Sequence, residues 1–261
     1  MKFIQSYYTD IGVKSTTNQD SLALIKAETD FGDVLLACVC DGMGGHSAGE
    51  LASKYCVQQI ADWFRTSFPE ILYSNFDTIV LEDELRDLVN DINHRLAVFG
   101  MNHELSLGTT LTAFLFFEDQ YFCVHVGDSR GYEITDRVRQ ITSDDSLVAR
   151  EMEQGIITPE QAAVDRRKNI LLQSVGITDQ ISMHFYSGYI RENACYLVCS
   201  DGFWHCIEDE EMVRYLSASQ IRDNRQLRRH LNYLVETDMA RGEKDNITAV
   251  AVIPCLSEEE V

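Results

Sequence analysis

The sequence predicts an α+β protein in which helices pack outside antiparallel sheets. Strand-like runs and helical runs come in separate blocks, which favours antiparallel sheets over alternating βαβ units. The clearest strand block lies between residues 109 and 141, where β-branched and aromatic runs are separated by tight turns. The chain has 261 residues, three prolines and no Gly/Ser-rich or Pro-rich linker, so we expect one domain over residues 1–261.

Two amphipathic helices are expected before the strand block. After the glycine-rich GMGGHSAGE, apolar residues recur at helical spacing from Leu51 to Phe64, and a second such pattern runs from Leu81 to Phe99. Each pattern has one apolar face, so we expect the two helices to pair. The strands expected next are Thr109 to Phe117, Tyr121 to Val126, Gly131 to Thr135 and Val138 to Ile141.

A polar segment separates this block from the rest of the chain. Residues from about Ser146 to Gly176 are expected to be largely helical, and Thr158-Pro159 is typical of a helix start. The elements expected after it are strands near Ile181 to Tyr186 and Ala194 to Cys199, helices near Asp209 to Leu216 and Arg225 to Ala240, and a final strand from Asn246 to Ile253.

The charge of the chain excludes some classes of partner. The formal net charge is −20, whereas nucleic acids and anionic membranes are bound through clustered Lys and Arg. We therefore expect neither a nucleic-acid nor a membrane partner. The opening MKFIQSYYTDIG lacks the features of a secretory signal, and the longest uncharged run, Leu105 to Phe117, is shorter than the roughly 20 residues that span a bilayer. A cytoplasmic protein is expected.

The eight cysteines are expected to be reduced thiols. No C-x-x-C pair suggests zinc, and disulfides are rare in the cytoplasm. The cysteines that fall within strand-like runs, and that we expect to be buried as small hydrophobic residues, are Cys38, Cys40, Cys123, Cys195 and Cys199.

Four aspartates stand at the ends of strand-like runs. Asp41 follows VLLACVC, Asp128 follows YFCVHVG, Asp201 follows CYLVCS, and Asp245 precedes NITAVAVI. Because the ends of neighbouring antiparallel strands lie side by side, the four carboxylates are expected to meet at one sheet edge. Collected carboxylates raise one another's pKa values unless a divalent cation neutralises them. The pattern therefore predicts a metal site.

The residues after Asp41 strengthen this interpretation over its alternatives. A single aspartate after a strand more often forms a turn or caps a helix, but Gly42 lets its carbonyl approach a cation with no Cβ in the way. The glycines do not match the phosphate-binding patterns G-x-x-x-x-G-K-[ST] or G-x-G-x-x-G. No Cys-x₅-Arg and no Asp-x-Asp occurs, which disfavours thiolate phosphatases, aspartyl-phosphate enzymes and EF-hands.

Six segments, in order and spacing, resemble a known family. They are TNQDS (17–21), CDGMGGHSAGE (40–50), GTTLTA (108–113), VGDSRGY (126–132), CSDGFW (199–204) and KDNIT (244–248). The chain resembles, over essentially its whole length, the metal-dependent serine/threonine protein phosphatases of type 2C, particularly the bacterial form. The resemblance implies a central antiparallel β-sandwich flanked by helix pairs on both faces.

The resemblance also implies roles for individual residues. Asp41 would bridge two Mn²⁺ or Mg²⁺ ions, with the Gly42 carbonyl on one of them, and Asp201 and Asp245 would bind the other. An all-oxygen ligand set suits these hard cations and disfavours zinc. In the family, phosphoserine and phosphothreonine monoesters on proteins are hydrolysed by direct attack of a water that the two ions activate.

Two further aspartates complete the implied set. Asp20 would lie beside the first ion and act largely through its waters, and Asp128 would share a third, weaker ion with Asp201. The alternative for Asp128 is that it only closes a turn and pairs with Arg130.

The chain departs from the family pattern in two places. Where many members carry a phosphate-gripping arginine, this chain has Ser15, and neighbouring Lys14 is the candidate substitute as a point charge. The alternative is that Lys14 is simply an exposed lysine. Where eukaryotic members place a histidine general acid, this chain has Met43. His46 lies nearby in the sequence and is a candidate for the general acid. A role in stabilising the loop is favoured for it, because a metal-bound water could protonate the leaving group instead.

A segment at about 146–168 resembles the mobile flap of bacterial members. Its cations are candidates for contacts with a phosphorylated substrate or for an ordinary solvated helix face. They are Arg150, Arg166, Arg167 and Lys168.

Three functions remain open from the sequence. The favoured one is a phosphatase acting on phosphorylated proteins that are substrates of a serine/threonine kinase, and we expect a monomer. The alternatives are a catalytically inactive phosphoprotein-binding regulatory module and a small-molecule phosphomonoesterase. The presence of all five aspartates favours an active enzyme over the inactive module.

Overall fold

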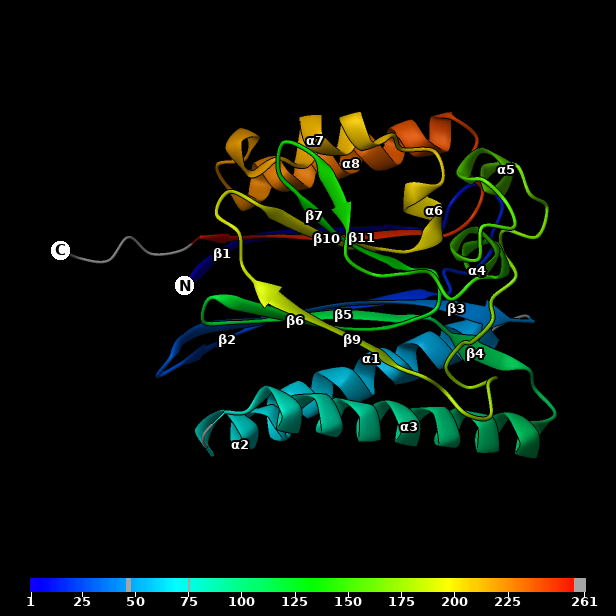
Figure 1. Ribbon diagram of the computed structural model, residues 1–261, viewed down its shortest axis with the longest axis horizontal. Helices are drawn as coiled ribbons and strands as arrows, with labels where there is room; N and C mark the ends of the chain where they lie inside the picture. Colours follow the sequence, from blue (N-terminus) through cyan, green and yellow to red (C-terminus); the bar gives the residue numbers. More distant parts are fainter. Residues whose placement is uncertain (46–47, 75, 256–261) are drawn as a thin grey trace.

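In the computed structural model, two antiparallel sheets stack face to face with helices outside both (Figure 1). The structure describes residues 1–45, 48–74 and 76–255. The first sheet has the order β1 (Lys2–Asp10), β11 (Ile247–Cys255), β10 (Cys195–Cys199), β7 (Arg130–Ile134) and β8 (Val138–Gln140). The second has the order β2 (Asp20–Thr29), β3 (Gly32–Gly44), β5 (Leu111–Phe117), β6 (Gln120–Val126) and β9 (His184–Tyr189), with β4 (Leu107–Thr109) paired to β3.

Helices cover the outer face of each sheet, which confirms the predicted sandwich with flanking helix pairs (Figure 1). The long helices α1 (Ala48–Thr66) and α3 (Thr78–His103) lie under the second sheet, joined by the short α2 (Phe68–Tyr73). The helices α7 (Asp209–Leu216) and α8 (Asn224–Ala240) lie over the first sheet, with the 3₁₀ turn η1 (Ala218–Gln220) between them. At one end of the sandwich lie α4 (Leu147–Glu153), α5 (Pro159–Ala163) and α6 (Asp201–Trp204).

The space between the two sheets is filled by aromatic side chains. Phe114 and Phe116 of β5 contact Tyr121 and Tyr196, with ring centroids 5.2 to 6.1 Å apart. Both phenylalanines are fully buried, and burying a side chain of this size contributes about 1.5–3 kcal/mol. This rigid core fixes the ends of the strands relative to one another.

The cysteines behave as predicted. All eight are free thiols, and the five in strand-like runs are buried. Burial raises the pKa of Cys40 and Cys123 well above the usual value, which keeps both side chains neutral inside the core.

Several elements differ from the sequence prediction. The strands β1 and β2 were not predicted, because their polar residues hide the alternation of buried and exposed positions. The strand β9 begins at His184 and not near Ile181, and the helical turn α6 was not predicted. Between residues 146 and 176 only α4 and α5 are helical, so this segment is less helical than expected.

The start of α5 agrees with the predicted helix start. The Thr158 hydroxyl accepts a hydrogen bond from the Gln161 amide at 3.3 Å, and the Gln161 side chain accepts one from the Thr158 amide at 2.8 Å. This reciprocal pair is a capping box, with Pro159 in the first turn.

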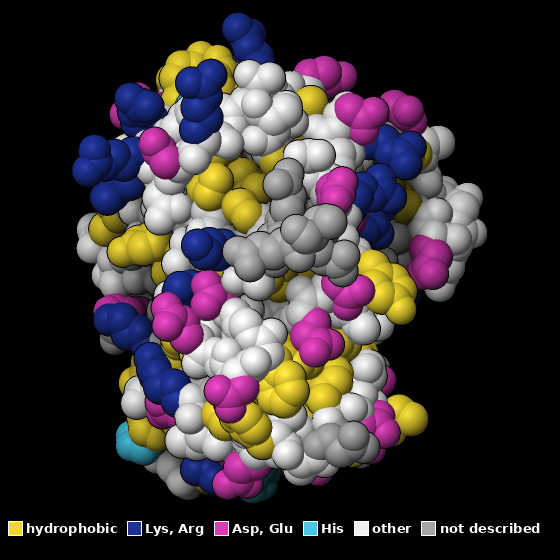
Figure 2. Space-filling model, turned by 90° about the vertical axis from the view of Figure 1, so that its left-hand side faces the viewer, with side chains coloured by type: hydrophobic (Ala, Val, Ile, Leu, Met, Phe, Trp, Pro, Cys, Tyr) yellow, Lys and Arg dark blue, Asp and Glu magenta, His cyan; other side chains and the backbone are white. Residues whose placement is uncertain are grey.

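No helix within the described residues is long and apolar enough to cross a membrane. The end of the sandwich away from α4, α5 and α6 is shown in Figure 2. On this face the described Lys and Arg side chains lie interspersed with Asp and Glu and do not form one continuous basic surface.

Candidate metal centre

Five aspartates approach one another at the end of the sandwich that carries α6. Asp20 begins β2 and lies directly opposite Asp41 of β3 in the strand register. Asp128 follows β6, Asp201 begins α6 after β10, and Asp245 immediately precedes the turn into β11. The aspartates do lie at one end of the sandwich, as predicted. The prediction of a single sheet edge was incomplete, because both sheets contribute carboxylates.

The backbone of Asp41 is held on both sides by two threonines. The Asp41 amide donates to Thr110 Oγ1 at 2.9 Å, and the Thr110 amide donates to the Asp41 carbonyl at 2.9 Å. Thr109 Oγ1 donates to the same carbonyl at 3.0 Å. Thr110 Oγ1 also lies 2.7 Å from Ser129 Oγ, which joins the Asp41 strand to the turn that carries Asp128.

The Asp20 carboxylate is fixed by a serine from the other sheet. Ser200 Oγ donates to Asp20 Oδ2 at 2.8 Å and accepts from the Thr248 amide at 3.0 Å. The other oxygen, Asp20 Oδ1, is buried without a hydrogen-bond partner among the described residues, and so is Asp201 Oδ1. Buried charged oxygens without partners are costly, so each fits a site for a cation.

Asn246 ties the start of β2 to the residue after Asp245. Its Oδ1 accepts from the Gln19 amide at 2.7 Å. Its Nδ2 donates to the Ile11 carbonyl at 2.8 Å and to the Thr17 carbonyl at 3.3 Å. The loop between residues 11 and 17 is therefore pinned beside Asp245.

Lys14 lies on this pinned loop. Its side chain is exposed and makes no ion pair with another described residue. The loop places the exposed Lys14 near Asp245.

Glycines allow the chain to pass close to Asp41. A Cβ on Gly42 would lie 2.1 Å from the Gly49 carbonyl oxygen, and a Cβ on Gly49 would lie 2.6 Å from the Gly42 carbonyl oxygen. The first turn of α1 therefore packs directly against the residue after Asp41, as only glycines permit. The other candidate of this motif, His46, lies outside the described residues.

His205, which the sequence analysis missed, lies next to Asp201 and Glu243. His205 Nδ1 lies 3.2 Å from Glu243 Oε2, and His205 Nε2 lies 3.8 Å from Asp201 Oδ2. Burial works against ionisation of Glu243, but hydrogen bonds from His205 and from the amides of Asp245 and Lys244 outweigh it and hold the pKa of Glu243 at about 2. The ionised Glu243 therefore orders the turn that carries Asp245.

The carboxylates strongly disfavour one another's charge. Burial, followed by the charges of Asp20 and Asp201, raises the pKa of Asp41 well above its usual value. Burial likewise raises the pKa of Asp20 to about 7 and that of Asp128 to about 7. Burial and the charge of Asp245 raise the pKa of Asp201, although His205 opposes them. Ionisation of the whole group thus needs added positive charge.

The side chains do not form a closed coordination sphere by themselves. In the described part of the chain, no group of three or more His, Cys, Asp and Glu side chains converges closely enough to hold a metal ion. The carboxylates are neighbours whose charges interact, and mutual repulsion opposes closer approach. The all-oxygen donor set and the two unpartnered oxygens fit a hard divalent cation.

Arg130 does not pair with Asp128, contrary to the turn interpretation of that aspartate. Its guanidinium makes hydrogen bonds of 2.7 to 3.1 Å to Asp144 and stacks over the ring of Trp204, 3.4 Å from the centroid. Because Trp204 ends α6, this contact fixes the helical turn that begins with Asp201.

The segment 146–168 lies near α6, which begins at Asp201, as a loop with two short helices (Figure 1). Its Arg167 is bound by carboxylates of the same segment, with Nη2 at 2.7 Å from Glu151 and 2.8 Å from Asp165. Arg167 therefore holds the segment together, and the substrate contact considered for it is not needed to explain its position.

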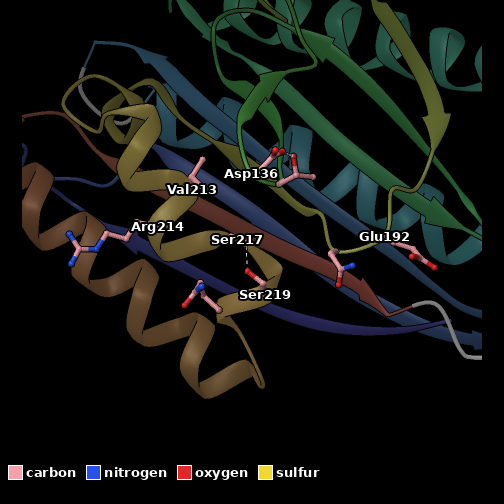
Figure 3. Close-up of a pocket in the computed structure, with 9 residues that line it drawn as sticks. Asp136, Glu192, Val213, Arg214, Ser217 and Ser219 are labelled. Atoms are coloured by element: carbon pink, nitrogen blue, oxygen red, sulfur yellow. Dashed lines mark hydrogen bonds between the residues drawn. The ribbon is translucent and has the colours of Figure 1, made fainter.

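One pocket lies at the other end of the sandwich. Its volume is about 640 Å³, and Asp136, Glu192 and Arg214 line it together with Ser217 and Ser219 (Figure 3). The strand β10 runs from the side of this pocket towards Asp201, so pocket and carboxylates are a strand length apart. This pocket is therefore separate from the aspartate cluster.

Comparison with known proteins agrees with this geometry. The model of the family described as protein phosphatase 2C matches residues 12–236. The protein phosphatase PhpP of Streptococcus pneumoniae is 31% identical over 262 residues, covering 98% of each chain.

Solved structures show the same fold. The serine/threonine phosphatase of S. agalactiae superposes with a TM-score of 0.84 at 29% identity, covering 97% of this chain and 99% of the other. The catalytic domain of PstP in complex with two manganese ions superposes with a TM-score of 0.77 at 30% identity, covering 97% and 99%. The fold, the ordered motifs and the clustered aspartates together show that the chain belongs to the protein phosphatase 2C family.

Proposed function

We propose that this chain is a metal-dependent protein serine/threonine phosphatase that hydrolyses phosphoserine and phosphothreonine monoesters on proteins. Several relatives are named serine/threonine phosphatases, which supports the proposal and gives no support to an inactive binding module. The observation that carries it is the pair of buried, unpartnered oxygens, Oδ1 of Asp20 and Asp201, within a cluster of mutually repelling carboxylates.

The residues proposed to hold two Mn²⁺ or Mg²⁺ ions are those of the cluster. Asp41 is proposed to serve both ions, the Gly42 carbonyl and Asp20 the first, and Asp201 and Asp245 the second. When bound, the ions supply Lewis acidity, charge neutralisation and an activated water at neutral pH. PstP was solved with two manganese ions, which supports Mn²⁺ as one choice.

The chain's own residues keep these ligands in place before substrate arrives. Thr110 fixes the Asp41 backbone through two hydrogen bonds, and Ser200 fixes one oxygen of Asp20. Asn246 joins the residue before β2 to the start of β11, and so links the two sheets beside Asp20 and Asp245. Preorganised charge of this kind costs no rearrangement during the reaction, which is how electrostatic catalysis gains its advantage over water.

Two residues have narrower proposed roles. Asp128 is proposed to share a third, weaker ion with Asp201, because its carboxyl is buried beside Asp201, and burial together with the charge of Asp201 raises its pKa to about 7. Lys14 is proposed to attract the substrate phosphate as a point charge from the loop pinned by Asn246.

The wider setting is also proposed. The substrates would be phosphorylated proteins modified by a serine/threonine kinase in the cytoplasm, and the enzyme would act as a monomer with residues 1–261 forming one domain. Relatives that are named as protein phosphatases support protein substrates over small phosphomonoesters.

The test is release of phosphate from a phosphothreonine peptide by chelator-treated protein, with and without added Mn²⁺. Turnover that requires Mn²⁺ and exceeds that of small phosphomonoesters is expected. Asp201→Asn should abolish it, whereas Asp136→Asn, an aspartate in the distant pocket, should not. Full activity after exhaustive chelation would contradict the metal-dependent mechanism, and peptide binding without turnover would favour the regulatory module.

A further inference from the structure

Asp145 connects three parts of the chain next to the aspartate cluster. Its Oδ2 accepts from the Gly127 amide at 2.9 Å, and its Oδ1 lies 2.8 Å from His184 Nε2. Its backbone amide donates to the Gly127 carbonyl at 2.7 Å, and its carbonyl accepts from the Leu172 amide at 2.7 Å. Asp145 therefore holds the turn before Asp128 on both sides.

The turn held in this way has little freedom. Gly127 has a positive φ of 109°, and a Cβ there would lie 2.6 Å from Thr110 Cγ2. Asp128 follows immediately, and Ser129 then bonds Thr110, which fixes the Asp41 backbone. The direction of the Asp128 carboxyl thus depends on the backbone that Asp145 clamps.

The same residue closes the base of segment 146–171. Next to Asp145, Ser146 forms an isolated bridge with Leu171, and the Leu147 amide donates to the Ile170 carbonyl at 2.9 Å. Two residues upstream, the Ser143 carbonyl lies 3.0 Å from His125 Nε2. Asp145 is thus linked to the end of β6 through Gly127 and to the start of β9 through His184. Its backbone also lies next to both ends of segment 146–171.

We propose that Asp145, held by His184, is a positioning residue that sets the Asp128 turn relative to the ends of segment 146–171. This inference rests on the proposed function in one respect, namely that Asp128 binds the weaker ion. Its geometric part, the clamp on Gly127, stands independently of any reaction. The pair is well suited to this role because the Asp145 side chain is 12% exposed and both of its oxygens are engaged.

The decisive variants are Asp145→Ala and Asp145→Asn. Alanine removes both side-chain hydrogen bonds. Asparagine retains them, because its oxygen accepts from Gly127 while its amide donates to His184 in the other ring tautomer. Losing a hydrogen bond changes an equilibrium constant by about two- to tenfold. Asp145→Ala should therefore lower the affinity of the weaker Mn²⁺ site by about that factor and leave the affinity of the tighter sites unchanged. Asp145→Asn should return the affinity of the weaker site to that of the wild type.

Two readouts are needed, and neither requires catalysis. Mn²⁺ binding is followed by electron paramagnetic resonance of the free ion, and hydrogen exchange reports the Gly127 amide. Exchange at Gly127 should accelerate in Asp145→Ala and return towards the wild-type rate in Asp145→Asn. His184→Ala removes only one partner and should give a smaller change in the same direction. Should Asp145→Ala fail to fold, His184→Ala carries the test.

Glu151→Ala is the matched control. Glu151 binds Arg167 within the same segment but makes no contact with Gly127. It should loosen the segment without changing Mn²⁺ binding or exchange at Gly127. Equal effects of Glu151→Ala and Asp145→Ala would overturn the proposal, as would unchanged exchange at Gly127 in Asp145→Ala. A wild-type protein without phosphatase activity would refute the proposed function. The exchange measurement would still test whether Asp145 fixes the Gly127 backbone.

Discussion

Asn246 and Gln19 join the two sheets through a 2.7 Å hydrogen bond from the Gln19 amide to Asn246 Oδ1. The bond connects the residue after Asp245 to the residue before Asp20, so two proposed ligands from different sheets depend on one amide side chain. Asn246 is 4% exposed, and its Nδ2 also donates to two carbonyls of the loop that carries Lys14.

Asn246→Ala should weaken both folding and metal binding. Three part-buried backbone groups lose their partner, and an intramolecular hydrogen bond contributes about 0.5–1.5 kcal/mol, so the free energy of unfolding should fall by about 1 kcal/mol or more. Urea denaturation and a Mn²⁺ titration measure the two effects. Asn224→Ala, which removes an exposed bond to the Gln5 amide, is the control. Equal Mn²⁺ affinity in the Asn246 variant and the wild type would contradict the bridging role.

Asp201→Asn and Asp245→Asn should each lower turnover by orders of magnitude without unfolding the protein. Each variant removes one proposed ligand and also one of the repelling carboxylates in the metal-free state. Metal-free stability should therefore stay equal or rise. Phosphate release and thermal unfolding in chelator are the measurements, and collapse of the fold in both variants would show that these side chains are structural.

Asp128→Ala should remove the proposed weaker ion and leave the two proposed inner ions bound. Metal content at low Mn²⁺ should stay near that of the wild type while turnover of protein substrates falls strongly. Because Arg130 pairs with Asp144, loss of Asp128 breaks no ion pair with that arginine. Metal stoichiometry measured beside kcat decides the question: reduced thermal stability with an unchanged ion count at saturating Mn²⁺ would favour a turn-closing role.

Lys14→Ala should raise KM for a phosphopeptide more than it lowers kcat, and Lys14→Arg should be neutral or beneficial. The ammonium is exposed on a loop fixed by Asn246, so we expect it to attract the substrate without taking part in the chemical step. Steady-state kinetics on one phosphopeptide measure the split. An unchanged KM in Lys14→Ala would show that other groups hold the phosphate.

Asp238 should make stability depend on pH. Its carboxylate is fully buried without a hydrogen-bond partner among the described residues, and burial, followed by the charge of Glu243, raises its pKa to about 7 from 3.8. Between these values the folded state binds more protons than the unfolded state. The free energy of unfolding should therefore fall as pH rises from about 4 to 7, by at most about 1.4 kcal/mol per pH unit from this group.

Asp238→Asn tests this dependence in chelator-treated protein. The variant should gain stability relative to the wild type as pH rises, and the difference should level off above pH 7. Denaturation curves at several pH values measure it. Parallel stability profiles for the two proteins would show that Asp238 does not titrate in this range.

The fold class was predictable from the sequence because its signals are local. Helical spacing gave α1 and α3, and β-branched runs gave β5, β6, β10 and β11. The strands β1 and β2 escaped prediction because polar residues occupy many of their positions, and pairing with β11 and β3 makes them strands. Their structure is a consequence of tertiary contacts.

The sequence by itself determined the candidate site residues: the aspartates at strand ends and the glycines after Asp41. Only the tertiary structure decided that the aspartates come from two sheets and which residues hold them. Ser200 bonds Asp20, Asn246 bonds Gln19, His205 bonds Glu243 and Asp145 bonds Gly127, over separations of 180, 227, 38 and 18 residues. Hydrogen bonds over such separations leave no periodic pattern in the sequence, because they arise when the packed sandwich brings its strand ends together.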